Sequence, residues 1–240
     1  MELSNKTVLV VGGTSGMGYA VAQQALAAGA RVMVASRSAE KVANAVAKLG
    51  GNASGIVVDA TDAVSIAQMW QRIGQVDHLV DHLVICAASI KAAGFRGTSI
   101  EDAMASMDSK FWGPFRLIQN AKIAQDGSIL LFSGLASRRP SPVTGTLSPI
   151  NAAVEAFGQA LALELAPIRV NVICPGLVDT EYWDNVPAAI RDQIFTSTIS
   201  KLPVGRIGTA TDIGRAALGM LTNEYITGAV LLVDGGGTLV

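Results

Sequence analysis

The sequence is poor in charged and aromatic side chains. Of its 240 residues, 15% are charged and 5% are aromatic, and the formal net charge is −1. A protein that binds nucleic acid or an anionic membrane surface needs a positive field, which this composition does not provide. We therefore expect no nucleic-acid partner and no membrane partner.

Cysteine and histidine are equally scarce. Cys86 and Cys174 are the only cysteines, and each lies in an apolar run of the kind that forms a buried strand. That placement predicts free thiols in a reducing compartment rather than a disulfide. His78 and His82 are the only histidines and fit no metal-ligand spacing, so we expect no metal site.

Long apolar runs are missing as well. No run reaches the roughly 20 residues that span a bilayer, and no basic-then-apolar leader precedes the first expected strand. Hydrophobic residues make up 50% of the chain, which is enough for one large core. Without a recognisable linker or internal repeat, we expect a cytoplasmic protein in which residues 1–240 form a single domain.

A glycine-rich turn follows the first expected strand. Residues 6–11 are rich in valine, as in a buried parallel strand, and residues 19–28 predict a helix closed by Gly29. The residues that we expect to line the turn are Gly12, Thr14, Ser15, Gly16, Met17 and Gly18. Glycines let the backbone approach a pyrophosphate, and the helix start offers free N–H groups. The pattern predicts a dinucleotide site, although a plain tight turn can use the same glycines.

The second and third expected strands bear on the choice of cofactor. The strand at residues 30–35 is followed by Ser36 and Arg37 where NAD-binding proteins carry an acidic residue. A guanidinium can pair with a 2′-phosphate, which favours NADP (NADPH) over NAD, unless Arg37 is only a solvated surface residue. The third strand is expected to end at Asp59, before Ala60. The Asp59 carboxylate could accept from the adenine amino group or cap the next helix.

Strands and helices alternate along the rest of the chain. We expect further strands at residues 78–86, 128–133, 169–174 and 229–233. We expect helices at residues 39–49, 62–73, 100–124, 146–166, 187–200 and 211–221, with residues 180–205 forming a flap. Such alternation predicts an α/β fold, a Rossmann-like doubly wound parallel sheet of about seven strands with helices on both faces.

The order of these motifs resembles the short-chain dehydrogenase/reductase family over nearly the whole chain. Besides the glycine turn, residues 169–180 (RVNVICPGLVDT) match the family's Pro-Gly turn, and residues 233–236 (VDGG) match its C-terminal motif. The resemblance implies that further residues contact the nicotinamide half or the pyrophosphate. They are Ala87, Ala88, Pro175, Gly176, Val178 and Thr180.

The catalytic positions depart from the family. By the resemblance, Leu147 stands at the tyrosine position, Asn151 at the lysine position, and Gly134, next to Ser133, at the serine position. Only three tyrosines occur, and none is followed four residues later by lysine. In the family the tyrosine supplies a proton, and the lysine ammonium lowers its pKa. Leu147 has no proton to give.

One exchange of residue types offsets this loss. The family's helix asparagine is replaced by Lys110, while its lysine is replaced by Asn151. We hypothesise that Lys110 orients the cofactor or donates the proton itself, with Asn151 and Ser133 as further catalytic candidates. The alternative is an exposed, unpaired helix lysine. Tyr182 could enter the site with the flap, or could only pack that flap.

The sequence features are consistent with two functions. The first is a divergent NADP(H)-dependent oxidoreductase acting on a small carbonyl or alcohol. The alternative is a non-redox or pseudoenzyme member of the fold that binds a dinucleotide without hydride transfer. The resemblance also implies a homodimer or homotetramer, for which the small side chains of Ala152, Ala156 and Ala160 would admit a partner helix, unless they serve the internal core.

Overall fold

A computed structural model describes residues 2–76, 79–90 and 94–240 of the chain. Its centre is a seven-stranded parallel sheet in the order β3-β2-β1-β4-β5-β6-β9. The strands are β1 (Thr7–Val11), β2 (Arg31–Ser36), β3 (Ala53–Val57), β4 (Val80–Ile85), β5 (Ile123–Phe132), β6 (Arg169–Pro175) and β9 (Val230–Val233). The expected doubly wound sheet of about seven strands is therefore confirmed.

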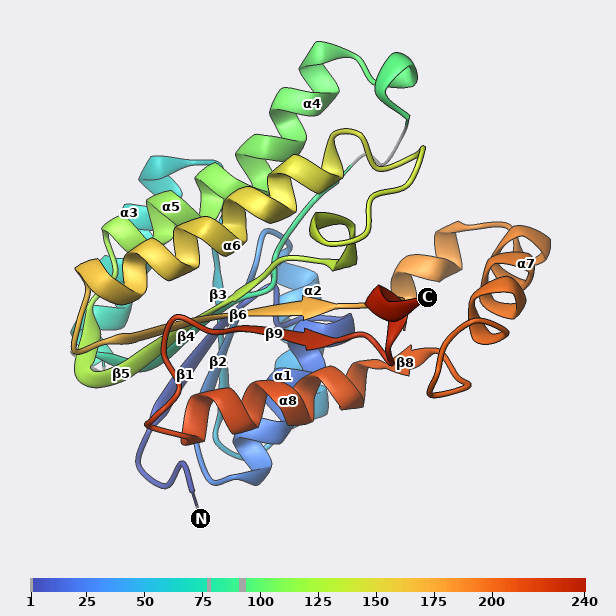
Figure 1. Cartoon of the computed structure of the whole chain (residues 1–240). Coiled ribbons are helices and arrows are strands. Elements are labelled where there is room, and N and C mark those ends of the chain that lie inside the picture. The colour runs from blue at the N-terminus through green and yellow to red at the C-terminus, as the bar shows by residue number, and fades with distance from the viewer. Residues whose placement is uncertain (1, 77–78, 91–93) are drawn as a thin grey trace.

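Helices cover both faces of this sheet (Figure 1). One face carries α3 (Ala63–Val76), α5 (Gly113–Gln119) and α6 (Leu147–Glu164), and α4 (Ile100–Met107) extends beyond it. The other face carries α1 (Gly16–Ala27), α2 (Ala39–Leu49) and α8 (Ala210–Thr222), with α7 (Ala188–Ile199) beyond the sheet near the C-terminus. Two buried apolar cores result, one on each face of the sheet.

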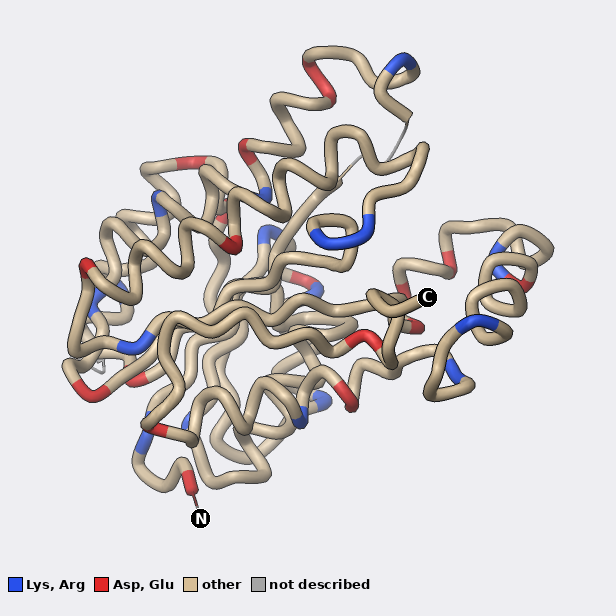
Figure 2. The backbone as a smooth tube through the Cα atoms, viewed as in Figure 1, with Lys and Arg blue, Asp and Glu red and all other residues tan. Residues whose placement is uncertain are grey.

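The central strands are apolar because both of their faces are covered. All five residues of β1 and all seven of β6 are buried. A strand that is buried on both faces loses the alternation of polar and apolar residues, which is the pattern that predicted these strands. Charged side chains of both signs are scattered along the chain (Figure 2), and β6 itself begins at the buried Arg169.

Several predicted boundaries were wrong. The third strand ends at Val57, so Asp59 lies in the following loop, and β5 begins at Ile123, inside the range expected to be helical. A π-helical turn, η2 (Asp108–Trp112), separates α4 from α5. The fourth strand begins at Val80, and the expected start at His78 lies outside the described residues. Local pattern does not show where a buried strand stops.

The segment after β6 forms structure that the sequence pattern did not indicate. A short strand, β7 (Val178–Asp179), pairs in parallel with β8 (Gly208–Thr209). Between them lie a 3-10 turn, η4 (Glu181–Asn185), and then α7, which has no buried residue. The segment that was expected to act as a flap is thus held at its two ends, while its helix contributes nothing to the core.

Candidate functional site

The first cavity, cavity one, encloses about 710 Å³ at the carboxyl ends of β1, β2 and β4. Among its lining residues are twelve of those predicted to bind the cofactor: Gly12, Thr14, Ser15, Gly16, Met17, Ser36, Arg37, Asp59, Ala60, Ala87, Ala88 and Thr180. The fold thus brings together residues that are far apart in the sequence. Such a crevice at the ends of parallel strands is the usual ligand position in open α/β sheets.

The glycine turn closes tightly on itself. A Cβ atom on Gly18 would lie 2.2 Å from the Gly12 carbonyl oxygen, and one on Gly12 would lie 2.5 Å from the Ala87 nitrogen. Gly12 also has a φ of 84°, a conformation that side chains rarely adopt. Gly18 lines neither cavity, so its part is to let the turn close rather than to touch a ligand.

Cationic side chains line one part of cavity one. Arg37 follows β2, while Lys41 and Lys48 lie on α2, and none of them forms an ion pair with the described residues. The two lysines were missed from the sequence. Their spacing of seven residues on a predicted helix, which puts them on one face, is the signal that could have found them.

Asp59 is fixed by its own loop. Its Oδ1 accepts hydrogen bonds from the Thr61 nitrogen at 2.9 Å and the Thr61 hydroxyl at 2.7 Å. Partial burial raises the pKa of this carboxyl, but the Thr61 bonds and the nearby Arg37 guanidinium outweigh it and hold the pKa below its ordinary value. Asp59 therefore remains ionised, and Asp62, rather than Asp59, accepts from the Val64 nitrogen in the first turn of α3.

The second cavity, cavity two, encloses about 400 Å³ and adjoins the first. Six residues line both: Met17, Cys86, Ala87, Ala88, Thr180 and Tyr182. The others in cavity two include Lys110, Ser133, Leu147, Gly176, Val178 and Trp183, whereas Pro175 lines neither. A ligand that lies along cavity one can therefore reach a mostly apolar chamber whose described lining includes Lys110.

Lys110 lies in the π-helical turn and points into the protein. Its Nζ donates a hydrogen bond of 3.0 Å to the Ser133 carbonyl oxygen. Burial lowers the pKa of this amine from 10.5 to about 8, against the opposing influence of Cys86 and Cys174. The alternative of an exposed, unpaired lysine is wrong, because the amine has a partner and lies in the wall of cavity two.

Asn151 is 1% exposed and lies outside both cavities. Its Nδ2 donates to the Gly134 carbonyl oxygen at 3.2 Å, and its Oδ1 is buried with no hydrogen-bond partner among the described residues. A Cβ atom on Gly134 would lie 3.0 Å from the Asn151 Nδ2. The amide therefore fills the space beside Gly134 and leaves little room for a larger residue there.

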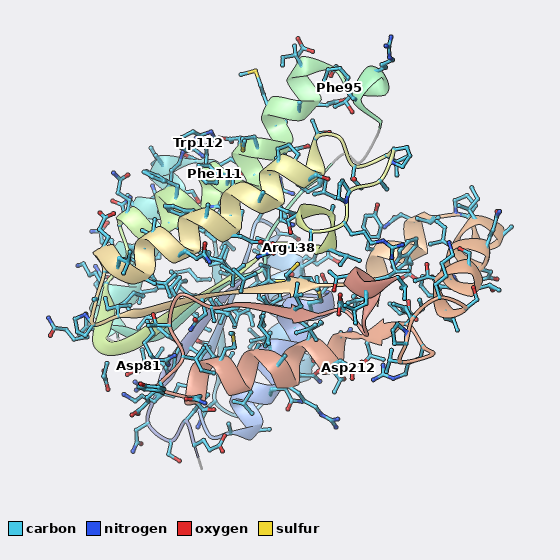
Figure 3. All side chains as sticks on the ribbon, viewed as in Figure 1. Asp81, Phe95, Phe111, Trp112, Arg138 and Asp212 are labelled. Atoms are coloured by element: carbon cyan, nitrogen blue, oxygen red, sulfur yellow. The ribbon has the colours of Figure 1, made fainter. Side chains whose placement is uncertain are left out.

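The Ser133 hydroxyl is engaged by a residue that lines neither cavity. The Oγ donates at 3.0 Å to Oε1 of Glu155, a carboxylate on α6 that is only 6% exposed. The Ser137 hydroxyl donates to the same oxygen. Arg138, which is labelled in Figure 3, pairs with the other oxygen at 2.8 Å. This buried network was missed, because a glutamate within a predicted helix gives no signal that it will be buried.

A second glutamate, Glu181, was missed because it is exposed and its partner is distant in the sequence. The Gly16 N–H, at the start of α1, donates to Oε2 of Glu181 at 2.8 Å, across 165 positions of sequence. Tyr182, the next residue, is 61% exposed, lines both cavities and packs edge-on against Trp183 of the same segment with ring centroids 5.5 Å apart. Thr180, Glu181 and Tyr182 together bring η4 against the glycine turn.

Two features are absent from residues 2–76, 79–90 and 94–240. In that part of the chain, no group of three or more His, Cys, Asp or Glu side chains could hold a metal ion. No helix within the same residues is long and apolar enough to cross a membrane.

Comparison with known proteins agrees with this geometry. A family model described as enoyl-(acyl carrier protein) reductase matches residues 11–238. The short-chain dehydrogenase/reductase ucsE of Acremonium sp. is 32% identical over 258 residues, covering 99% of this chain and 97% of that protein. The chain belongs to the short-chain dehydrogenase/reductase family, a family of oxidoreductases.

Two solved structures are especially informative. A small-chain dehydrogenase in complex with NADPH superposes with a TM-score of 0.81 at 34% identity, covering 98% of this chain and 99% of the other. An NADPH-bound short-chain oxidoreductase from Pseudomonas aeruginosa PAO1, described as containing an atypical catalytic center, has a TM-score of 0.88 at 26% identity, covering 98% and 97%.

Proposed function

We propose that this chain is an NADP(H)-dependent oxidoreductase that acts on a small carbonyl or alcohol, with Lys110 as its proton donor. The observation that carries the proposal is the position of the Lys110 amine, in the wall of an apolar cavity that adjoins the dinucleotide cavity. The two NADPH-bound relatives support the choice of cofactor, and the second supports an unusual catalytic centre in this family.

The residues present fit a dinucleotide. Cavity one combines a glycine turn at a helix start with the cations Arg37, Lys41 and Lys48, which suit a 2′-phosphate. Pro175 ends β6, and Gly176, Val178 and Thr180 follow it, where the family resemblance assigns all four to the nicotinamide half or the pyrophosphate. A bound dinucleotide would supply or accept the hydride.

Proton donation and its positioning are the tasks of the protein's own side chains. As negative charge grows on a carbonyl oxygen in cavity two, the Lys110 ammonium would donate its proton there. A pKa near 8 suits that task, because a weakly held proton is transferred readily at neutral pH. The Ser133 carbonyl would hold the Nζ in place, and Asn151 would fix the adjoining turn through the Gly134 carbonyl.

Calorimetric titration with NADPH and NADH side by side tests the cofactor. The wild type should prefer NADPH, and Arg37→Ala should weaken NADPH binding by roughly tenfold while leaving NADH unchanged. Arg72→Ala is the matched control, since Arg72 is exposed on α3 and lines neither cavity. Failure of both nucleotides to bind would overturn the proposal.

One observation favours a second candidate, a dinucleotide-binding protein without hydride transfer. Leu147 lines cavity two where the family has its tyrosine, so that position offers no phenol. Tight NADPH binding without any carbonyl-dependent oxidation would favour this candidate. In either case we propose a homodimer or homotetramer, because Ala152, Ala156 and Ala160 are exposed on α6 rather than buried in the core.

A further inference from the structure

A carboxylate from a distant part of the chain is bound at the start of α1. The Gly16 N–H donates to Oε2 of Glu181 at 2.8 Å. Within the first turn of α1 there is no acidic residue, and Ser15 makes no side-chain capping bond. Glu181 is therefore the anion that this helix start holds in the structure.

The same N–H lies in the turn that should cradle the cofactor's diphosphate. A helix start favours negative charge, but one N–H cannot serve a carboxylate and a phosphate oxygen at once, and the two anions repel each other. We propose that Glu181 is an internal competitor for the diphosphate, so that the dinucleotide must displace this carboxylate as it binds. This inference rests on the proposed function, since it concerns the same cavity.

Displacement of Glu181 would also move the boundary between the two cavities. Thr180 and Tyr182, its neighbours, line both cavities. Trp183 lines cavity two, donates from Nε1 to the Val178 carbonyl oxygen at 3.0 Å, and packs edge-on against Phe195 of α7 with ring centroids 5.1 Å apart.

Because α7 has no buried residue, few contacts oppose a shift of this segment. The competitor thus links occupation of the phosphate turn to the position of Tyr182 and to access to cavity two. A ligand without a diphosphate would leave Glu181 in place and would not set off this change.

The test is calorimetric titration of wild type, Glu181→Gln and Asp184→Asn with NADPH and with adenosine 2′-monophosphate. Both variants remove one negative charge from η4, but only the first weakens the contact with Gly16. Glu181→Gln should lower the NADPH dissociation constant by roughly fivefold, since a neutral amide holds the N–H less strongly than a carboxylate. Asp184→Asn should leave it unchanged, and neither variant should alter binding of the monophosphate, which lacks a diphosphate.

Every outcome decides the matter. An equal gain in NADPH affinity in both variants, or an equal gain in affinity for the monophosphate in Glu181→Gln, would indicate a general charge effect. Either result would overturn the proposal that Glu181 competes with the diphosphate. Unchanged NADPH affinity in Glu181→Gln would overturn it while leaving the proposed function intact. Absence of NADPH binding in the wild type and in both variants would overturn both proposals, whereas binding gained only in Glu181→Gln would support the competitor. Faster hydrogen exchange of the Gly16 amide in nucleotide-free Glu181→Gln than in Asp184→Asn is the supporting structural result.

Discussion

Replacing Lys110 by methionine should stabilise the protein at neutral pH, and this gain should disappear in alkaline solution. Burial lowers the pKa of the Lys110 amine from 10.5 to about 8. Below about pH 8 the folded protein therefore holds a buried ammonium, and desolvation of this charge lowers the free energy of unfolding by its full amount.

The sign and size of the pH dependence follow from proton binding. Between about pH 8 and about pH 10.5 the unfolded chain keeps the Lys110 proton while the folded protein releases it, so the free energy of unfolding rises with pH. The difference between the two pKa values corresponds to about 3 kcal/mol at most. Loss of the hydrogen bond to the Ser133 carbonyl costs about 1 kcal/mol, which leaves a net gain of about 2 kcal/mol near pH 7.

Denaturant unfolding across this pH range measures the effect. The free energy of unfolding of Lys110→Met minus that of the wild type should fall steadily above about pH 8 and should change sign between about pH 9.5 and pH 10, where the remaining burial cost equals the lost hydrogen bond. Lys201→Met is the control, because Lys201 is exposed and lines neither cavity. A difference that does not vary with pH would show that the amine is not buried and would refute the reasoning.

Three further changes test other parts of the structure. Gly18→Ala should abolish dinucleotide binding in a calorimetric titration, because its Cβ would lie 2.2 Å from the Gly12 carbonyl oxygen. Gly219→Ala is the control and should keep dinucleotide binding, because its Cβ would meet open space. Arg169→Met should lower the free energy of unfolding by about 3 kcal/mol in denaturant titrations, because the buried guanidinium donates to three carbonyl oxygens around the end of α8. Asp212→Asn should cost about 1 kcal/mol at neutral pH. The Arg206 guanidinium and the Thr209 bonds hold the pKa of Asp212 well below its usual range, so this cost should shrink as acid protonates the carboxylate, and a cost independent of pH would contradict the assignment.

The sheet and the phosphate turn could be predicted because their signals are local. The valine run of β1 and the glycines after it encode a buried strand and a tight turn within a dozen residues. The alternation of such units then fixes a parallel sheet with few possible topologies. For the same reason, the predicted residues of cavity one come together in the structure.

The polar contacts of the site could not be predicted, because they join distant segments. Glu155 meets Ser133 across 22 positions, and Glu181 meets Gly16 across 165. Neither glutamate differs, in local pattern, from one that faces solvent. Lys110 was identified only through its exchange with Asn151, and the two residues differ in place: Lys110 lies in the wall of cavity two, whereas Asn151 is buried and lines neither cavity.

The most direct test of the account is NADPH oxidation by wild type and Lys110→Met in the presence of a panel of small ketones and aldehydes at about neutral pH. We predict carbonyl-dependent oxidation by the wild type, and its loss in Lys110→Met with NADPH affinity retained. Full activity in Lys110→Met would contradict the role of Lys110. Tight NADPH binding with no carbonyl-dependent oxidation in the wild type would contradict the proposed reaction and leave a dinucleotide-binding member of the family.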